Sequence, residues 1–199
     1  MVRPAVKTPT VIVVAIAFAM VALTGPTTAS ASPDPKSIVL PLNDMPTGFG
    51  LKDAKYYSAA AVVKEQDTTM AQLKSWGYVN GYQAEYDRDV SLGSMLNGPI
   101  EIDSYASVYK HDDGAKKSMQ ASLDSARKQH YPELSVGTRL GDDAHMFSYA
   151  KKSGSSTFQI YIVMWRHHAV KNTILTVGLK GAVSPQQAVN LAKAQDKRN

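Results

Sequence analysis

Leu140-Gly141-Asp142-Asp143-Ala144 opens the stretch of sequence that decides the fold, and two apolar segments follow it. Residues 157–165 read Thr-Phe-Gln-Ile-Tyr-Ile-Val-Met-Trp, and residues 173–177 read Thr-Ile-Leu-Thr-Val. Both segments are rich in β-branched and aromatic side chains, which pack well on a pleated sheet. We interpret the pair as the central hairpin of a β-sheet, with the other elements packed around it.

Alternation of side chains predicts the remaining strands. Residues 78–88 and residues 100–109 place successive side chains on opposite sides with a period of two, as in a half-buried strand. Residues 144–150 form a further predicted strand before the first apolar segment, and residues 170–179 extend the second segment into a strand.

Two later helices have strong start and stop signals. Asp112-Asp113-Gly114 begins a helix whose apolar residues recur at helical spacing until Pro132 ends it. Ser184-Pro185-Gln186-Gln187 combines an N-cap serine, proline at the first helical position and glutamine at the third. Because consecutive strands have short connections, we predict a single α+β domain with a mainly antiparallel sheet and helices packed on one face.

Two shorter helices are predicted before the first strand. Asp53 is a candidate cap for a helix that runs through Val63. Thr69-x-x-Gln72 resembles a capping box for a second helix, which Gly77 ends.

The N-terminus has the pattern of a secretory signal peptide. Basic residues precede a continuous apolar run from Val11 to Leu23, and Ala29-Ser30-Ala31 offers the small residues of a cleavage site. The run has 13 residues, fewer than the ~20 that span a bilayer as a helix. We therefore expect a signal peptide at 1–31, an extended segment at 32–52 and the domain at 53–199. An uncleaved membrane anchor is the alternative.

Composition narrows the possible functions of the exported chain. The sequence contains no cysteine, which excludes disulfides, thiol catalysis, cysteine-ligated metals and a lipid anchor on cysteine. Of the formal charge of +5, Arg3 and Lys7 contribute two, so 20 basic and 17 acidic side chains remain after residue 31, a net charge of +3. This bias is too weak and too scattered to predict nucleic-acid binding.

Four motifs in order carry a resemblance to a known family. They are Leu40-Pro41-Leu42-Asn43-Asp44-Met45-Pro46-Thr47-Gly48-Phe49, Trp76-Gly77-x-x-x-Gly81-Tyr82, Leu140-Gly141-Asp142-Asp143-Ala144 and Trp165-Arg166. In this order the chain resembles a family of uncharacterised exported bacterial proteins with sensor-like and lipoprotein-like members. The resemblance covers nearly all of the chain after the signal, and it brings no catalytic residues.

One position departs from that family pattern. The family usually has a Gly-Asn turn after the arginine, whereas this chain has His167-His168-Ala169. Neither histidine nor alanine favours positive φ, so a longer loop is expected here in place of a two-residue turn.

Histidines and carboxylates give the only candidates for metal or acid–base chemistry. Strand alternation places Asp143 and His145 on one face, close enough to share a metal ion or a proton, with Asp142 and His111 as further candidates. The simpler interpretation is that the aspartates after Gly141 bond backbone N–H groups in a turn. No zinc-type histidine spacing, nucleophile elbow or phosphate-binding loop is present, so no cofactor is predicted.

Aromatic residues give the strongest prediction of a binding site. A set of them falls on strand faces that we assign opposite the aliphatic one, and such a surface suits a ligand or a protein partner. The candidate ligand-binding residues are Tyr105, Tyr109, His145, Tyr149, Tyr161 and Trp165, with Phe147 beside them as a residue that favours the core. If a helix covers this face, all of them are ordinary core residues.

These observations favour an exported, non-enzymatic domain that binds an unknown ligand or an envelope protein. A metal-assisted hydrolase using Asp142, Asp143 and His145 is one alternative, and a structural or scaffolding module is another.

Overall fold

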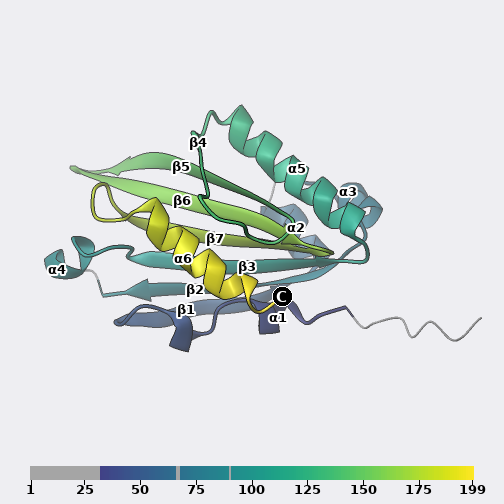
Figure 1. The fold of residues 1–199 in the computed structure, drawn as a ribbon, viewed down its shortest axis with the longest axis horizontal. Coiled ribbons are helices and arrows are strands. Elements are labelled where there is room, and N and C mark those ends of the chain that lie inside the picture. Colours follow the sequence, from purple (N-terminus) through teal and green to yellow (C-terminus); the bar gives the residue numbers. More distant parts are fainter. Residues whose placement is uncertain (1–31, 66–67, 90) are drawn as a thin grey trace, which may run out of the picture. The chain divides into compact units, whose positions relative to one another are not determined.

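A computed structural model describes residues 32–199 except 66, 67 and 90, so the predicted signal peptide lies outside the described residues. Seven antiparallel strands form one sheet in the order β1-β2-β3-β7-β6-β5-β4 (Figure 1). The strands are β1 (Phe49–Tyr57), β2 (Tyr78–Arg88), β3 (Glu101–Tyr109), β4 (Glu133–Leu134), β5 (Asp143–Ser153), β6 (Ser156–His167) and β7 (Val170–Leu179). The helices are α1 (Pro35–Ile38), η1 (Leu42–Asp44), α2 (Ala59–Glu65), α3 (Met70–Ser75), α4 (Leu92–Met95), α5 (Asp112–Lys128) and α6 (Pro185–Asp196).

The predicted central hairpin is confirmed. It consists of β6 and β7. Because β7 also pairs with β3, it is the fourth of the seven strands in the sheet order. The predicted α+β class, the antiparallel sheet and the single domain are confirmed as well. None of the helices in the described ranges combines the length and the apolar character needed to cross a bilayer.

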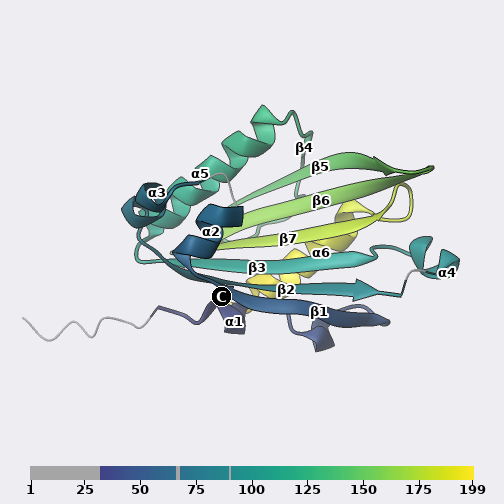
Figure 2. The same cartoon turned by 180° about the vertical axis from the view of Figure 1, so that it is seen from behind.

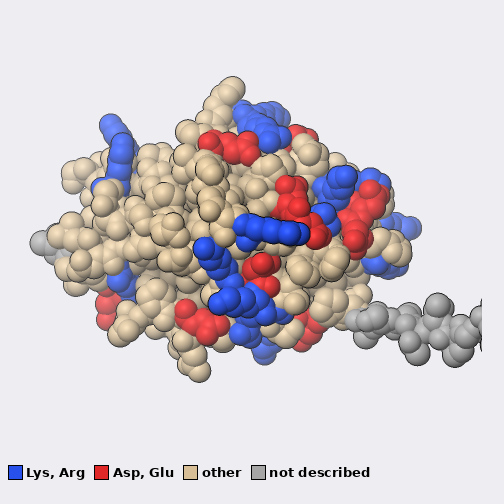
Figure 3. Space-filling model, in the orientation of Figure 1, with Lys and Arg blue, Asp and Glu red and all other residues tan. Residues whose placement is uncertain are grey.

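One face of the sheet carries α6 and the N-terminal segment. Ala188, Leu191 and Ala192 of α6 pack with Trp165 in the largest core cluster, which also contains Ile38 of α1. Ser184 and Gln187 form the predicted capping box at the start of α6. Lysine and arginine side chains on this side of the molecule lie among aspartates and glutamates and are not gathered by sign (Figure 3).

The opposite face carries α5, α2 and α3 (Figure 2). Met119 and Leu123 of α5 pack on Phe147 and Met164, while Tyr57, Val62 of α2 and Leu73 of α3 form a smaller cluster. The prediction that the helices pack on one face is therefore wrong. Both faces are covered because successive residues of β6 are apolar on both sides: Val163 packs towards α6 and Met164 towards α5.

The N-terminal boundaries also differ from the prediction. Asp53 caps no helix, since it lies within β1 and pairs with Glu85 of β2. The segment 32–52 is not simply extended, because it contains α1 and η1 and buries Val39 and Leu40. Most side chains of β1 are exposed on both sides, so this edge strand lacks the alternation that reveals a strand in sequence.

The connection between β6 and β7 is a two-residue turn, which corrects the expected longer loop. His167 pairs with Val170, and His168 adopts a φ of 49°. The Asp142 carboxylate accepts a hydrogen bond from the backbone N–H of His168 at 2.8 Å, and the Arg166 guanidinium donates to the His168 carbonyl at 3.1 Å. These two contacts hold a conformation that a non-glycine residue seldom adopts.

Candidate ligand-binding groove

Two adjoining cavities lie between α5 and the sheet. One has a volume of about 270 Å³ and the other about 330 Å³. Both are lined by Tyr105, Ser122, Met164 and Lys171, and we call the two cavities together the α5 groove. The face of α5 turned to the groove carries small side chains such as Ala121 and Ser125, which leave this space open between the helix and the strands.

Apolar side chains form much of the wall of the first cavity. Leu73 and Trp76 come from the end of α3, and Ile162 and Met164 come from β6. Tyr131, which follows α5, adds a ring that is stacked on Tyr149 of β5 with centroids 4.4 Å apart. A pocket of this composition suits the apolar body of a small molecule.

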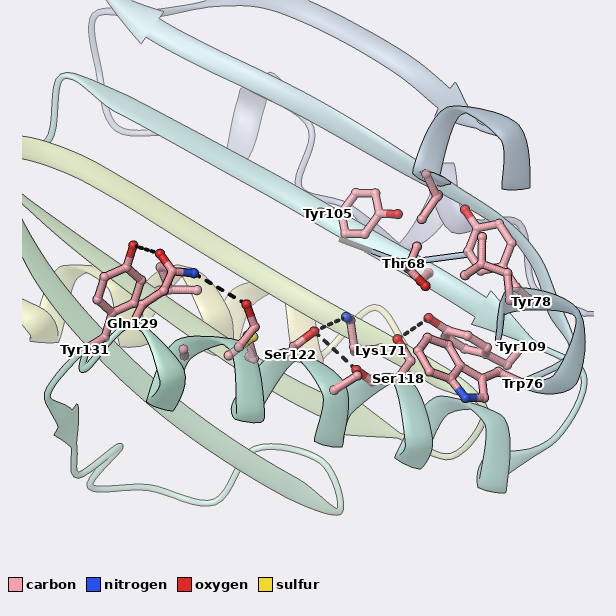
Figure 4. Close-up of a pocket in the computed structure, with 18 residues that line it drawn as sticks. Thr68, Trp76, Tyr78, Tyr105, Tyr109, Ser118, Ser122, Gln129, Tyr131 and Lys171 are labelled. Atoms are coloured by element: carbon pink, nitrogen blue, oxygen red, sulfur yellow. Dashed lines mark hydrogen bonds between the residues drawn. The ribbon is translucent and has the colours of Figure 1, made fainter. Parts of the chain in front are cut away.

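A chain of polar groups follows the inner side of α5 (Figure 4). The Tyr109 hydroxyl donates to Ser118 Oγ at 2.6 Å, and Ser122 Oγ donates to the Ser118 carbonyl at 3.2 Å. Lys171 Nζ donates to Ser122 Oγ at 2.8 Å. Lys171 reaches this chain from β7, where it lies opposite Ser107 of β3.

Lys171 is a buried cation. Its exposed fraction is 7%, and burial lowers the pKa of its ammonium group to about 8. Among the residues that the structure describes, no ion pair includes Lys171. A buried charge without a counter-ion is unfavourable, so a buried ammonium group that has no negative partner is unusual.

The tyrosines around the groove are neutral donors and acceptors. Burial raises the pKa of the Tyr78 and Tyr109 hydroxyls above the ordinary range. The Tyr78 hydroxyl donates to the Tyr57 carbonyl at 2.8 Å. Their rings meet in edge-to-face pairs, Tyr78 with Tyr109 and Tyr57 with Tyr105, at centroid distances of 5.6 Å. The aromatic wall is therefore held rigidly.

Acidic residues border the second cavity. Asp103 and Glu65 both line it, and burial raises the pKa of the Asp103 carboxyl to about 7. Oδ1 of Asp103 is buried and has no hydrogen-bond partner. Carboxylate oxygens of Asp103, Glu85 and Glu101 lie within 4.8 Å of one another, although Lys52 pairs with both glutamates.

The structure divides the predicted aromatic site between the two faces of the sheet. Tyr105 and Tyr109 line the groove. His145 and Tyr149 project from β5 towards the same face but outside the two cavities. Tyr161 and Trp165 belong to the α6 face, and Trp165 is fully buried there. The prediction that all six share one surface is therefore wrong, whereas ligand binding by the tyrosines stays a prediction.

The structure confirms that Asp143 and His145 of the alternative hydrolase lie on one face of β5 and in contact, whereas Asp142 has a separate structural task. His145 lies between two carboxylates, with Nδ1 2.6 Å from Glu133 and Nε2 3.1 Å from Asp143. Asp142 instead pairs with Arg166 at 3.0 Å and holds the His168 turn. That backbone contact lowers the pKa of the Asp142 carboxyl. The turn interpretation thus describes Asp142, while His111 precedes α5 at its N-cap position.

Sequence reasoning missed the polar residues of the groove, chiefly Lys171, Ser118 and Ser122. A signal for Lys171 was present, because it is the single charged residue in the predicted strand 170–179. The two serines stand four apart on α5, on the same side of the helix, but small polar residues on a helix have no distinctive pattern.

Comparisons with known proteins support the fold. The chain matches no model of a protein family, and no curated protein is significantly similar to it in sequence. A similar solved structure is the extracellular domain of PknH from Mycobacterium tuberculosis, with a TM-score of 0.56 and 7% sequence identity. The similarity covers 82% of this chain and 95% of that domain. At this level of identity it concerns the fold alone.

Proposed function

We propose that the protein is an exported, non-enzymatic domain that binds a small ligand in the α5 groove. The observation that carries this proposal is the composition of the first cavity, in which apolar and aromatic walls enclose a short row of polar groups. Small-molecule sites typically combine these features, with the polar groups fixing the orientation of the ligand.

Export is supported by the signal-peptide pattern of residues 1–31. The likeness of the fold to an extracellular domain agrees with it. The test is the intact mass of the protein recovered from the medium and the envelope of its host. A chain that begins at Ser32 is expected, whereas a membrane-bound chain that keeps residues 1–31 would support the uncleaved anchor.

Binding is a better interpretation of the groove than catalysis. Lys171 and Ser122 are 2.8 Å apart, a pairing also found in serine hydrolases that use a lysine base. However, the Ser122 hydroxyl donates to the Ser118 carbonyl. Ser122 also lies inside α5, where its own N–H is bonded within the helix and cannot stabilise an oxyanion. The pair therefore supports a role in holding a ligand.

The binding proposal is tested with N-phenyl-1-naphthylamine, an uncharged dye whose fluorescence rises in apolar sites. We expect saturable binding of one dye per protein. Ala121→Trp should weaken it roughly tenfold or more, because Ala121 lines the cavity from an exposed position and an indole there would occupy part of the cavity. Gln120→Trp, at the neighbouring exposed position of α5 that does not line the groove, is the matched control and should bind like the wild type. Equal binding by both variants, or no saturable binding by the wild type, would contradict the proposal and favour a structural module.

A further inference from the structure

Lys171 provides more hydrogen-bond donors than the protein uses. An ammonium group has three donors, and Ser122 Oγ takes one of them at 2.8 Å. Both cavities are lined by Lys171, and Figure 4 shows its nitrogen at the inner side of α5, beside the open space of the groove. The remaining donors and the positive charge are available to a ligand.

Neighbouring hydroxyls complete a site for a negatively charged group. Ser118 Oγ accepts from Tyr109, so the hydrogen of Ser118 itself can be given to another acceptor. Ser107 lies opposite Lys171 on the adjacent strand and also lines the first cavity. These buried hydroxyls line the same cavity as the buried amine, and charged acceptors form the stronger hydrogen bonds with such donors.

The charges around the groove limit the ligand to a single negative charge. Of the residues that the structure describes, Lys171 is the one basic residue that lines either cavity. Glu65 and Asp103 border the second cavity and would repel a second negative charge. Glu65 has partners of its own and does not pair with Lys171, since it accepts from the Tyr57 hydroxyl at 2.8 Å and lies 3.5 Å from the Lys55 ammonium group. The apolar end of the first cavity, at Leu73 and Trp76, is left for the body of the ligand.

We infer that the α5 groove binds a small organic monoanion, a carboxylate on an apolar body, with Lys171 as its counter-ion and the serine hydroxyls as further donors. The inference rests on the proposed ligand-binding function and adds the chemical class of the ligand. When Lys171 is protonated, a bound carboxylate would supply the negative charge that this buried ammonium group lacks.

The test compares 1-naphthoate with 1-naphthamide, which have nearly the same shape and differ in charge. Each compound displaces N-phenyl-1-naphthylamine from the protein. We expect 1-naphthoate to bind roughly tenfold or more tightly than the amide, because hydrogen bonds to charged groups are the stronger ones. The dianion 1-naphthyl phosphate is expected to bind more weakly than 1-naphthoate. A preference for the phosphate would overturn the monoanion assignment.

Variants assign the preference to Lys171. Lys171→Met keeps an unbranched apolar stem and removes the ammonium group, and it should abolish the preference for the carboxylate while dye binding persists. Lys151→Met removes an exposed lysine of β5 outside the groove and should leave the preference intact. Equal affinity for acid and amide in the wild type would overturn the monoanion inference but leave the ligand-binding groove standing. Failure of the dye itself to bind would instead contradict the proposed function.

A pH series on the wild type tests the same inference without a variant. Affinity for 1-naphthoate should fall from about pH 6.5 to about pH 9.5, while affinity for the amide stays constant, because Lys171 loses its proton near pH 8. Among the described residues, the other titratable groups that line the two cavities are Glu65, Asp103, Tyr57, Tyr78, Tyr105, Tyr109 and Tyr131. Ionisation of Asp103 near pH 7 acts in the same direction, so Asp103→Asn isolates the lysine. A carboxylate affinity that is independent of pH in Asp103→Asn would contradict the role of Lys171.

Discussion

Trp165 Nε1 donates a hydrogen bond to Asp196 Oδ1 at 2.9 Å, and this contact joins β6 to the end of the C-terminal helix α6. The other oxygen of Asp196 accepts from the backbone N–H of Gly141 at 3.3 Å. One carboxylate therefore connects β6, α6 and the chain just before β5. The motif residues Gly141 and Trp165 meet at this point, which gives them a structural task on the α6 face.

Removal of this carboxylate should destabilise the domain. Asp196→Ala leaves the buried indole N–H of Trp165 without an acceptor, and we expect the free energy of unfolding to fall by about 2 kcal/mol. Urea denaturation followed by tryptophan fluorescence measures it. Asp124→Ala on the exposed side of α5, where the carboxylate only accepts from Gln120, is the control and should have little effect. Equal losses in the two variants would show that the Asp196 contacts contribute nothing specific.

Gly141 is predicted to be intolerant of any side chain. It has a φ of 48°, and a Cβ atom there would lie 2.1 Å from the Arg166 carbonyl oxygen, whereas a Cβ atom at Gly137 would meet nothing within 4 Å at a φ of 68°. Gly141→Ala should therefore cost about 3 kcal/mol or more, and Gly137→Ala only the ~1 kcal/mol of the left-handed backbone. Thermal unfolding of both variants gives the comparison. Similar losses would mean that the close approach at Gly141 relaxes without cost.

The two adjacent aspartates should differ in their contribution to stability. Asp142→Ala removes the acceptor for the His168 N–H and the partner of Arg166. We expect the free energy of unfolding to fall by about 1 kcal/mol, because the turn keeps its strained φ but loses the contacts that stabilise it. Asp143→Ala removes only an exposed contact to His145 and should be nearly neutral. Chemical denaturation at neutral pH measures both variants. A larger effect at Asp143 would contradict this expectation and show that its contact with His145 contributes to stability.

The raised pKa of Asp103 predicts a specific pH dependence. The folded protein holds this proton up to about pH 7, whereas the unfolded chain releases it near the ordinary value of about 3.9. Between these values the folded state binds more protons, so this group makes the free energy of unfolding decrease as pH rises. Asp103→Asn should therefore gain stability relative to the wild type as pH increases from about 4 to 7.5. A difference in melting temperature that does not change over this range would contradict the buried, raised carboxyl.

Much of the fold was predictable because the central strands carry strong local signals. The helix caps at Thr69 and Ser184 were read correctly, since capping depends on residues only three positions apart. The strand at 49–57 was not predictable because its exposed side chains follow no apolar period. The helix that each face of a strand meets was not predictable either. When both faces are covered, alternation shows that Val163 and Met164 differ in direction but not which helix each one meets.

The site was predictable only in part, for a related reason. Tyr105 and Tyr109 were identified from their shared face of β3, and the structure places both in the wall of the groove. Trp165 was assigned to the same surface because the sequence does not specify how β3 and β6 are aligned. Their relative register depends on the pairing of each strand with β7. Lys171 acquires its meaning only when α5 covers it, a contact between residues far apart in the chain.

The central claim is that the α5 groove binds a small anion, and mapping of backbone amide shifts by NMR tests it most directly. The ¹⁵N-labelled protein is titrated with 1-naphthoate. Binding in the α5 groove should give the largest shifts at the amides of Ser107, Ser118, Ser122 and Lys171, while the amides of Ala188 and Leu191 in α6 remain unchanged. Shifts that cluster on the α6 face, or no saturable shift at any residue of the groove, would contradict the claim.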